Sequence, residues 1–175
     1  MTDTAGNEPR AIPTVDIRAA SAADLIVLVD DRAAFAHRVG SPAPGGWPQF
    51  PQAIEFTIDH LTAHPQEADW WMHFFFFEGL LVGSGGYVGR PRGGIVEIGF
   101  EIAPGQRRKH YATGAAAALV AKAFDTGEVK AIIAHTLPQE GAATKVLDRV
   151  GFANEGEMKD PQQGTVWRWR MSRPR

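Results

Sequence analysis

A short basic segment, residues 106–110, carries the clearest chemical signal in this sequence. Four of its five residues are cationic or can become so, among them Arg107, Arg108 and Lys109. The alanine-rich residues that follow, 112–124, predict a helix. A helix start carries free backbone N–H groups and the positive end of the helix dipole, and both attract anions. The segment is therefore a candidate seat for a pyrophosphate, although a basic, solvated loop has the same composition.

Two carboxylates lie just before this segment. In residues 96–102, apolar side chains alternate with Glu97, Gly99 and Glu101, which is the two-residue period of a strand. A carboxylate on an otherwise apolar strand needs an explanation, because burial without a partner costs free energy. A carboxylate can remove a proton from a reacting group, directly or through a water. Each could instead bind an arginine, a backbone N–H group or a cationic ligand.

The elements around these residues alternate between strands and helices, with no internal repeat. A strand, a helix and a second strand in succession predict a parallel crossover after residue 102. Ser21 is a plausible N-cap for the first helix. Along the chain, we predict strands at 11–18, 70–77, 80–88, 95–102, 129–137, 152–157 and 165–171, and helices at 22–37, 51–64, 112–124 and 142–150.

The long connection at residues 39–51 contains three glycines and four prolines, which predicts an irregular loop. Loops of this length without secondary structure are uncommon unless they have a role. Trp47 and Phe50 give the loop an apolar face, so it either covers a substrate site or packs on the core. In the next helix, Phe56 lies off the apolar stripe.

The basic segment and its neighbours resemble the acyl-CoA-binding motif of the GNAT superfamily of N-acetyltransferases, especially the branch that acetylates ribosomal-protein N-termini. The superfamily pattern Gln/Arg-x-x-Gly-x-Gly/Ala aligns with residues 107–112, with His110 where the family usually has glycine. Residues 97–102, 135–138 and 147–152 and the closing tryptophan strand also resemble the family. The resemblance covers residues 12–171.

The resemblance implies an α/β (α+β) fold in one GNAT-like domain. A strongly curved mixed sheet of six or seven strands is expected, with splayed central strands and about four helices. Residues 1–10 are predicted to form a flexible arm, and residues 11–175 the acyltransferase domain. The acyl-CoA is expected to lie in the gap between the fourth and fifth strands.

The chemistry implied by the resemblance is direct transfer of an acyl group, chiefly acetyl from the co-substrate acetyl-CoA, to a primary amine of a small molecule or protein N-terminus. The amine must lose a proton, since its pKa is about 8 to 10.4. Glu97 lies where related enzymes place the base, and Glu101 shares its face. A strand N–H near Glu101 or Ile102 would hold the oxyanion. The implied cofactor-binding residues are Ile102 and Ala103 for pantetheine, and Arg107, Arg108, Lys109, His110, Tyr111, Ala112 and Thr113 for pyrophosphate.

The sequence departs from the family where a proton donor is usual. The ribosomal branch has Asn-x-x-Ser after the fifth strand, and Glu140 and Ala143 occupy those positions here. A tyrosine used in other branches aligns with Leu147. Tyr111 lies in the phosphate turn, and Thr144 is only a weak substitute, so no acid is predicted. The alternative function is therefore a catalytically weak or inactive acyl-CoA-binding sensor, or a protein-interaction module with the same fold.

Composition bounds the partners. A net charge of −2 and a pI near 6.3 argue against nucleic-acid and membrane-surface binding. The absence of cysteine excludes disulfides and thiolate sites. His60 and His64 have a metal-ligand spacing but no third ligand, so no metal is expected. The N-terminus has no apolar signal core, which makes a cytoplasmic location the default. A homodimer through the aromatic closing strand is left open.

Overall fold

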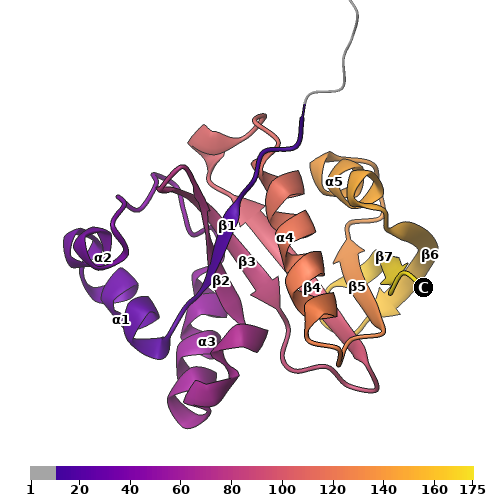
Figure 1. The fold of residues 1–175 in the computed structure, drawn as a ribbon, viewed down its shortest axis with the longest axis horizontal. Helices are drawn as coiled ribbons and strands as arrows, with labels where there is room; N and C mark the ends of the chain where they lie inside the picture. Colours follow the sequence, from indigo (N-terminus) through magenta and orange to yellow (C-terminus); the bar gives the residue numbers. More distant parts are fainter. Residues whose placement is uncertain (1–10) are drawn as a thin grey trace, which may run out of the picture.

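Seven strands form one mixed sheet in the part of the chain that the computed structural model describes, residues 11–175 (Figure 1). The flexible arm predicted at residues 1–10 lies outside the described residues. The strands are β1 (Asp16–Ala19), β2 (Met72–Phe77), β3 (Leu80–Tyr87), β4 (Ile95–Ile102), β5 (Ala131–Thr136), β6 (Ala153–Asp160) and β7 (Gly164–Ser172). Their order in the sheet is β1-β2-β3-β4-β5-β7-β6. The expected mixed sheet of six or seven strands is confirmed.

Helices pack against both faces of this sheet. Figure 1 shows the first three helices beside β1–β3, while α4 crosses the sheet and α5 lies next to β5. Within residues 11–175, no helix combines the length and apolar character needed to cross a bilayer. The helices are α1 (Ala22–Asp30), α2 (Arg32–Val39), α3 (Pro51–Ala63), α4 (Tyr111–Asp125) and α5 (Ala142–Val150), with short 3-10 helices η1 (Pro65–Trp70) and η2 (Pro104–Gln106).

The first predicted helix is two helices, so the described residues contain five α-helices rather than about four. Asp31 adopts an extended conformation between α1 and α2, and its carboxylate accepts the N–H groups of Ala33 and Ala34, both at 3.0 Å. A side chain that caps the backbone locally favours a new helix start over continuation of the old helix. The N-cap predicted at Ser21 is confirmed, as part of a capping box with Asp24.

The antiparallel strands β2, β3 and β4 pack closely because β3 is rich in glycine. A Cβ atom on Gly85 would lie 2.3 Å from the Gly99 carbonyl oxygen and 2.7 Å from the Phe75 ring. A Cβ atom on Gly83 would lie 2.2 Å from the Glu101 carbonyl oxygen. The glycines of β3 therefore allow the neighbouring strands to approach closely.

The sheet parts between β4 and β5. These parallel strands pair only where Ile95–Glu97 meets Ala131–Ile133, and beyond that point β4 pairs with β3 while β5 pairs with β7. The Val88 N–H donates to the Glu97 carbonyl, and the Ala103 N–H donates to the Val82 carbonyl. Backbone groups alternate along a strand, so those of Phe100 and Ile102 point away from β3 into the gap. The expected splay of the central strands is confirmed.

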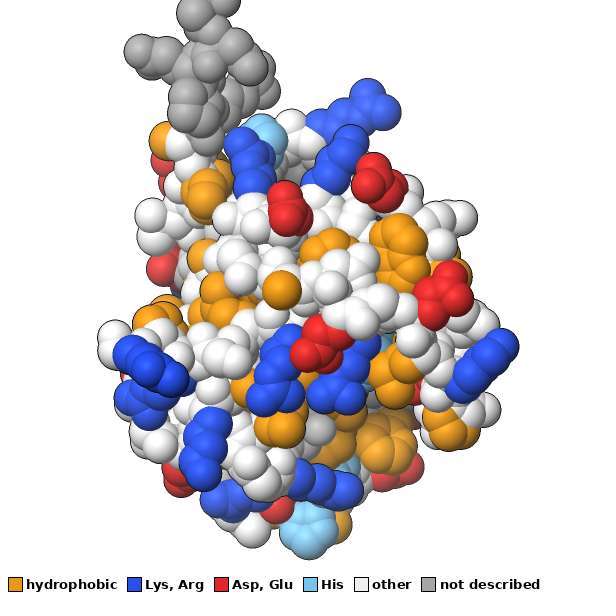
Figure 2. All heavy atoms as spheres, turned by 90° about the vertical axis from the view of Figure 1, so that its right-hand side faces the viewer, with side chains coloured by type: hydrophobic (Ala, Val, Ile, Leu, Met, Phe, Trp, Pro, Cys, Tyr) orange, Lys and Arg blue, Asp and Glu red, His pale blue; other side chains and the backbone are white. Residues whose placement is uncertain are grey.

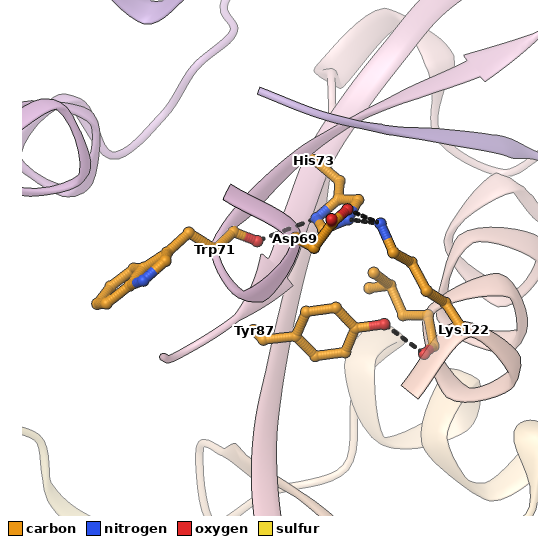
Figure 3. A network of polar contacts seen from close by, with 6 residues as sticks. Asp69, Trp71, His73, Tyr87 and Lys122 are labelled. Carbon is orange, nitrogen blue, oxygen red and sulfur yellow. Dashed lines mark hydrogen bonds and ion pairs between the residues drawn. The ribbon is translucent and has the colours of Figure 1, made fainter. Parts of the chain in front are cut away.

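A polar network ties η1 and β2 to α4 (Figure 3). His73 is fully buried, and its Nδ1 donates to the Trp71 carbonyl at 3.0 Å. Its Nε2 is therefore left to accept from Lys122 Nζ, 2.8 Å away, and Lys122 also contacts Asp69 at 2.7 Å. Tyr87 donates to the Leu119 carbonyl at 2.6 Å. The network fixes α4, whose N-terminus faces the gap.

Candidate active site

Two adjoining cavities open beside the gap. The helix-start pocket has a volume of about 610 Å³ and is lined by residues of the basic segment, the first turn of α4 and one face of α5. The strand-face pocket has a volume of about 530 Å³ and lies over β3 and β4 beside α3. Phe50, Phe100 and Glu101 line both. A ligand in one pocket can therefore lie directly against a ligand in the other.

The first turn of α4 offers unpaired donors to the helix-start pocket. No side chain caps this helix, and its first internal backbone bond runs from the Gly114 N–H to the His110 carbonyl at 3.1 Å. The preceding N–H groups, of Tyr111, Ala112 and Thr113, have no partner in the part of the chain that the structure describes, so they can bind an anion. Gly114 itself packs against Pro13, whose carbonyl oxygen would lie 2.2 Å from a Cβ at that position. The helix start is thus held in place while its donors stay available.

The backbone conformation of His110 accounts for the glycine that the superfamily pattern has at this position. Its backbone has φ +62°, in the left-handed region that favours glycine. Its side chain turns toward α5, where Arg149 Nη1 donates to His110 Nδ1 at 2.8 Å. The imidazole is thereby held by a neighbouring helix, and the substitution of glycine is compatible with an open helix-start pocket.

The predicted cofactor residues divide between those that reach the pocket and those that do not. Arg107 and Arg108 line the helix-start pocket, and Arg107 Nε also donates to the Ile102 carbonyl at 3.3 Å. Lys109 is not among the lining residues, and its Nζ donates to Gln106 Oε1 at 3.0 Å. Ala103 is buried, with its N–H bonded to Val82 and its carbonyl to Gln106. The predicted residues that line the pocket are Ile102, Arg107, Arg108, His110, Tyr111, Ala112 and Thr113.

Two further cations were missed by sequence reasoning. Lys145 and Arg149 on α5 line the helix-start pocket opposite the basic segment. Their four-residue spacing on a helix was a usable signal, because it places both side chains on one face. Figure 2 shows the molecular face at the α5 and β5–β7 end, where Lys and Arg lie among acidic and apolar side chains rather than in one continuous patch. This face therefore carries no single basic patch.

Glu97 pairs with His135 across the point where β4 and β5 separate. Glu97 Oε1 lies 2.8 Å from His135 Nδ1, and both residues line the strand-face pocket. A carboxylate only accepts hydrogen bonds, so the imidazole Nδ1–H is the donor. His135 Nε2 is buried and has no hydrogen-bond partner among the described residues. The contact with His135 holds Oε1 of Glu97 in place and does not involve Oε2.

Glu101 has a different environment. Its Oε1 accepts the Gln49 backbone N–H at 3.2 Å, while its Oε2 is buried without a partner in the described part of the chain. Burial raises the pKa of Glu101, only partly opposed by the Gln49 N–H and the nearby Arg107. One alternative for the two carboxylates was that each binds a backbone N–H group. Glu101 does so, and its hydrogen bond to Gln49 connects the loop before α3 to β4.

That loop is anchored at its centre. Trp47 is buried, and its Nε1 donates to Ser84 Oγ at 2.9 Å. Arg32 donates to the carbonyls of Pro44 and Trp47. The expected packing on the core is confirmed for Trp47, whereas Phe50 lines the two pockets. That the loop covers a substrate site stays a prediction.

The weak candidates for a proton donor are engaged elsewhere. The Thr144 hydroxyl donates to the Gly141 carbonyl and accepts the Gly141 N–H, both at 2.9 Å, so it caps α5. Tyr111 is buried with its ring 4.7 Å from that of Phe77. Ala143, at the usual serine position, does line the helix-start pocket. The geometry thus assigns no side chain as an acid.

The histidine pair on α3 has an aromatic environment. His60 Nε2 contacts Glu67 Oε2 at 2.7 Å, and its ring lies 4.3 Å from Trp71 and 4.9 Å from His64. Over residues 11–175, no group of three or more His, Asp or Glu side chains is arranged to hold a metal ion.

A parted sheet with an open helix start at the gap forms a site that can bind an anionic group such as a phosphate. Residues 15–153 match the family model described as Acetyltransferase (GNAT) domain. The chain belongs to this family and is a GNAT-type N-acetyltransferase. A comparison with curated proteins gives no match.

Solved structures with the same fold are similar over nearly the whole chain. The RimL ribosomal L7/L12 alpha-N-protein acetyltransferase in complex with coenzyme A shares 18% identity with a TM-score of 0.65, covering 92% of this chain and 97% of that one. Mycobacterium smegmatis RimJ in complex with CoA-disulfide shares 19% identity with a TM-score of 0.66, and the match covers 92% of this chain and 83% of that one. The aminoglycoside acetyltransferase AAC(6')-Ib in complex with coenzyme A shares 18% identity with a TM-score of 0.65, and the match covers 91% of this chain and 95% of that one. At this identity the similarities establish the shared fold.

Proposed function

We propose that the protein transfers an acyl group, most directly acetyl, from acyl-CoA to a primary amine of a small molecule or a protein N-terminus. The observation that carries this proposal is the meeting of the two pockets at Glu101 and Phe100, beside the gap between β4 and β5. Similar folds with coenzyme A bound support the same reading.

The residues of the helix-start pocket fit a CoA tail. Pyrophosphate would be held by the free N–H groups of Tyr111, Ala112 and Thr113, with Arg107 and Arg108 adding charge-assisted hydrogen bonds. Lys145 and Arg149 add positive charge from α5. The backbone groups of Phe100 and Ile102 that point into the gap would bind the pantetheine amides. The thioester supplies an acyl carbon that a neutral amine can attack.

Glu97 is the proposed base. His135 holds Oε1, so the second oxygen of Glu97 can accept a proton from the incoming ammonium, directly or through a water. The N–H of Ile102 or Phe100 is the proposed donor to the oxyanion, since both face the gap while Glu101 pairs toward β3. Glu101 is the second candidate base, because its raised pKa suits a proton acceptor, although one of its oxygens is already bonded.

No acid is required for the leaving group. An ordinary thiol has a pKa of about 8.5, so a thiolate can depart without protonation. The lack of a serine at position 143 is therefore compatible with turnover. A cytoplasmic location and a homodimer remain predictions, to be tested by cell fractionation and by light scattering.

Two measurements test the proposal together. Isothermal titration calorimetry with acetyl-CoA is expected to show one site per chain. A thiol-release assay over a panel of amines is expected to show CoA release that depends on the acceptor. Binding without acceptor-dependent release would favour the acyl-CoA sensor, and no binding would favour an interaction module.

A further inference from the structure

We propose that the acceptor is a small primary amine carried on a flat, apolar group, an arylalkylamine, and that the strand-face pocket binds it. This rests on the proposed acyl transfer and specifies the acceptor for the same site. Three observations carry it: the apolar wall of the pocket, the way its aromatic rings are held, and the small number of carboxylates among its described lining residues.

The wall is made of large apolar side chains that the fold leaves exposed. Phe50, Phe56 and Val88 line the pocket and are 63%, 62% and 61% exposed. Phe56 lies off the core-facing stripe of α3, so burial in the core does not account for it. Apolar side chains that gather around one concave site are typical of ligand binding. A pocket of about 530 Å³ suits a compact organic molecule.

The aromatic rings of this wall are held by their neighbours. The Trp71 ring lies 5.7 Å from the Phe56 ring and 4.3 Å from the His60 ring. Trp71 is only partly buried, and it also lines the pocket. Tilted aromatic pairs present both faces and edges, which favour a further ring over an aliphatic chain of the same area.

The polar groups of the pocket accommodate one ammonium rather than several. Among the described residues, Glu97 and Glu101 are the only acidic ones that line it, and Glu101 already accepts the Gln49 N–H. The Thr57 hydroxyl donates to the Ala53 carbonyl, and the Ser84 hydroxyl accepts from Trp47. The other polar side chains of its described lining, His135 and Gln163 among them, are not carboxylates. A polycation would therefore leave its further ammonium groups without an ionic partner, which is costly.

The register of the sheet places the charged and apolar parts next to each other. The Val88 N–H donates to the Glu97 carbonyl at 3.0 Å, and directly paired residues project from the same face. An amine at the Glu97 carboxylate would therefore have its carbon skeleton against Val88. From there it would extend toward the ring of Phe56.

The test compares acceptors by kcat/KM in the acceptor-dependent CoA-release assay with acetyl-CoA. The panel holds 2-phenylethylamine, tryptamine, ethylamine, spermidine, an aminoglycoside and a peptide with an N-terminal serine. The two arylalkylamines are expected to exceed every other acceptor by at least about tenfold. An equal or higher value for ethylamine, a polar amine or the peptide overturns the proposal, as does release with none of them.

A variant locates the binding. Phe56→Ala is expected to raise the KM for 2-phenylethylamine about tenfold while the KM for acetyl-CoA stays unchanged. The matched control is Val29→Ala, which removes an apolar side chain of similar exposure on α1, outside both pockets. An unchanged KM in Phe56→Ala would place the acceptor elsewhere. If acetyl-CoA binds and spermidine is the preferred acceptor, only the acceptor class fails; if acetyl-CoA does not bind, the proposed function fails with it.

Discussion

Glu97 on β4 and His135 on β5 are 38 residues apart in sequence and 2.8 Å apart in space, at the point where their strands stop pairing. The contact orients a carboxylate at the entrance to the gap. His135 is therefore a positioning residue for the proposed base. The same contact also links the two strands next to their last pair, Glu97 and Ile133.

Removing the carboxylate charge tests the base. Glu97→Gln is expected to lower kcat about 100-fold or more, because general base catalysis contributes on that scale. The pH optimum should rise, since the amine must then lose its proton to solvent. His135→Asn is expected to lower kcat about tenfold. Pre-steady-state and steady-state CoA release at a series of pH values would measure both effects.

The control for this pair is the double variant. If His135 acts through Glu97, adding His135→Asn to Glu97→Gln should cost much less than in the wild type. Acetyl-CoA affinity by calorimetry should stay the same throughout. A pH profile of Glu97→Gln identical to that of the wild type would remove Glu97 from this role.

His110 offers a stability prediction at the start of α4. Its φ of +62° suits glycine, so His110→Gly is expected to stabilise the protein by about 1 kcal/mol, less a small loss from the exposed Arg149 contact. Lys109→Gly is the control, because Lys109 is not among the residues with positive φ, and glycine there should destabilise. Urea unfolding measures both, and equal destabilisation by the two changes would contradict the account.

Buried His73 predicts a loss of stability in mild acid. Burial, reinforced by the charge of Lys122, lowers its pKa to about 4. In the unfolded chain His73 takes up a proton below about pH 6.5, whereas in the folded protein it stays neutral down to about pH 4. Stability from this residue is therefore complete above pH 6.5 and lost as pH falls toward 4, by about 3 kcal/mol.

Denaturant unfolding between pH 7.5 and pH 4 measures that loss. His73→Gln should flatten the dependence in this window, while His37→Gln, at an exposed histidine on α2, should leave it intact. A His73→Gln protein with the wild-type slope would show that another group is responsible.

Gly85 tests the close pairing of β3 and β4. Gly85→Ala is expected to destabilise by about 2 kcal/mol or more, because the added methyl group meets the Gly99 carbonyl, which is backbone and cannot move aside. Gly99→Ala is the matched control on the facing strand, since a Cβ there has no neighbour within 4 Å. Unfolding midpoints of the two variants should differ clearly.

Much of the fold could be predicted because its signals are local. The alternation in β4, the Ser21 cap and the stop at Gly151 each depend on residues a few positions apart. The break at Asp31 was missed because a capping aspartate inside an apolar stripe gives no periodicity change. Lys145 and Arg149 were missed as pocket residues because they line the helix-start pocket only through the position of α5 relative to α4.

The sequence by itself determined the strand, basic turn and helix that form one side of the helix-start pocket. These elements could be predicted because helix capping, charge and hydrophobic periodicity act over one or two turns of chain. Only the tertiary structure decided which side chains meet at the reaction point. Sheet register brought His135 to Glu97, and the packing of α3 set Phe56 beside Trp71. Such contacts depend on strand pairing and helix docking over long sequence separations, which no local pattern specifies.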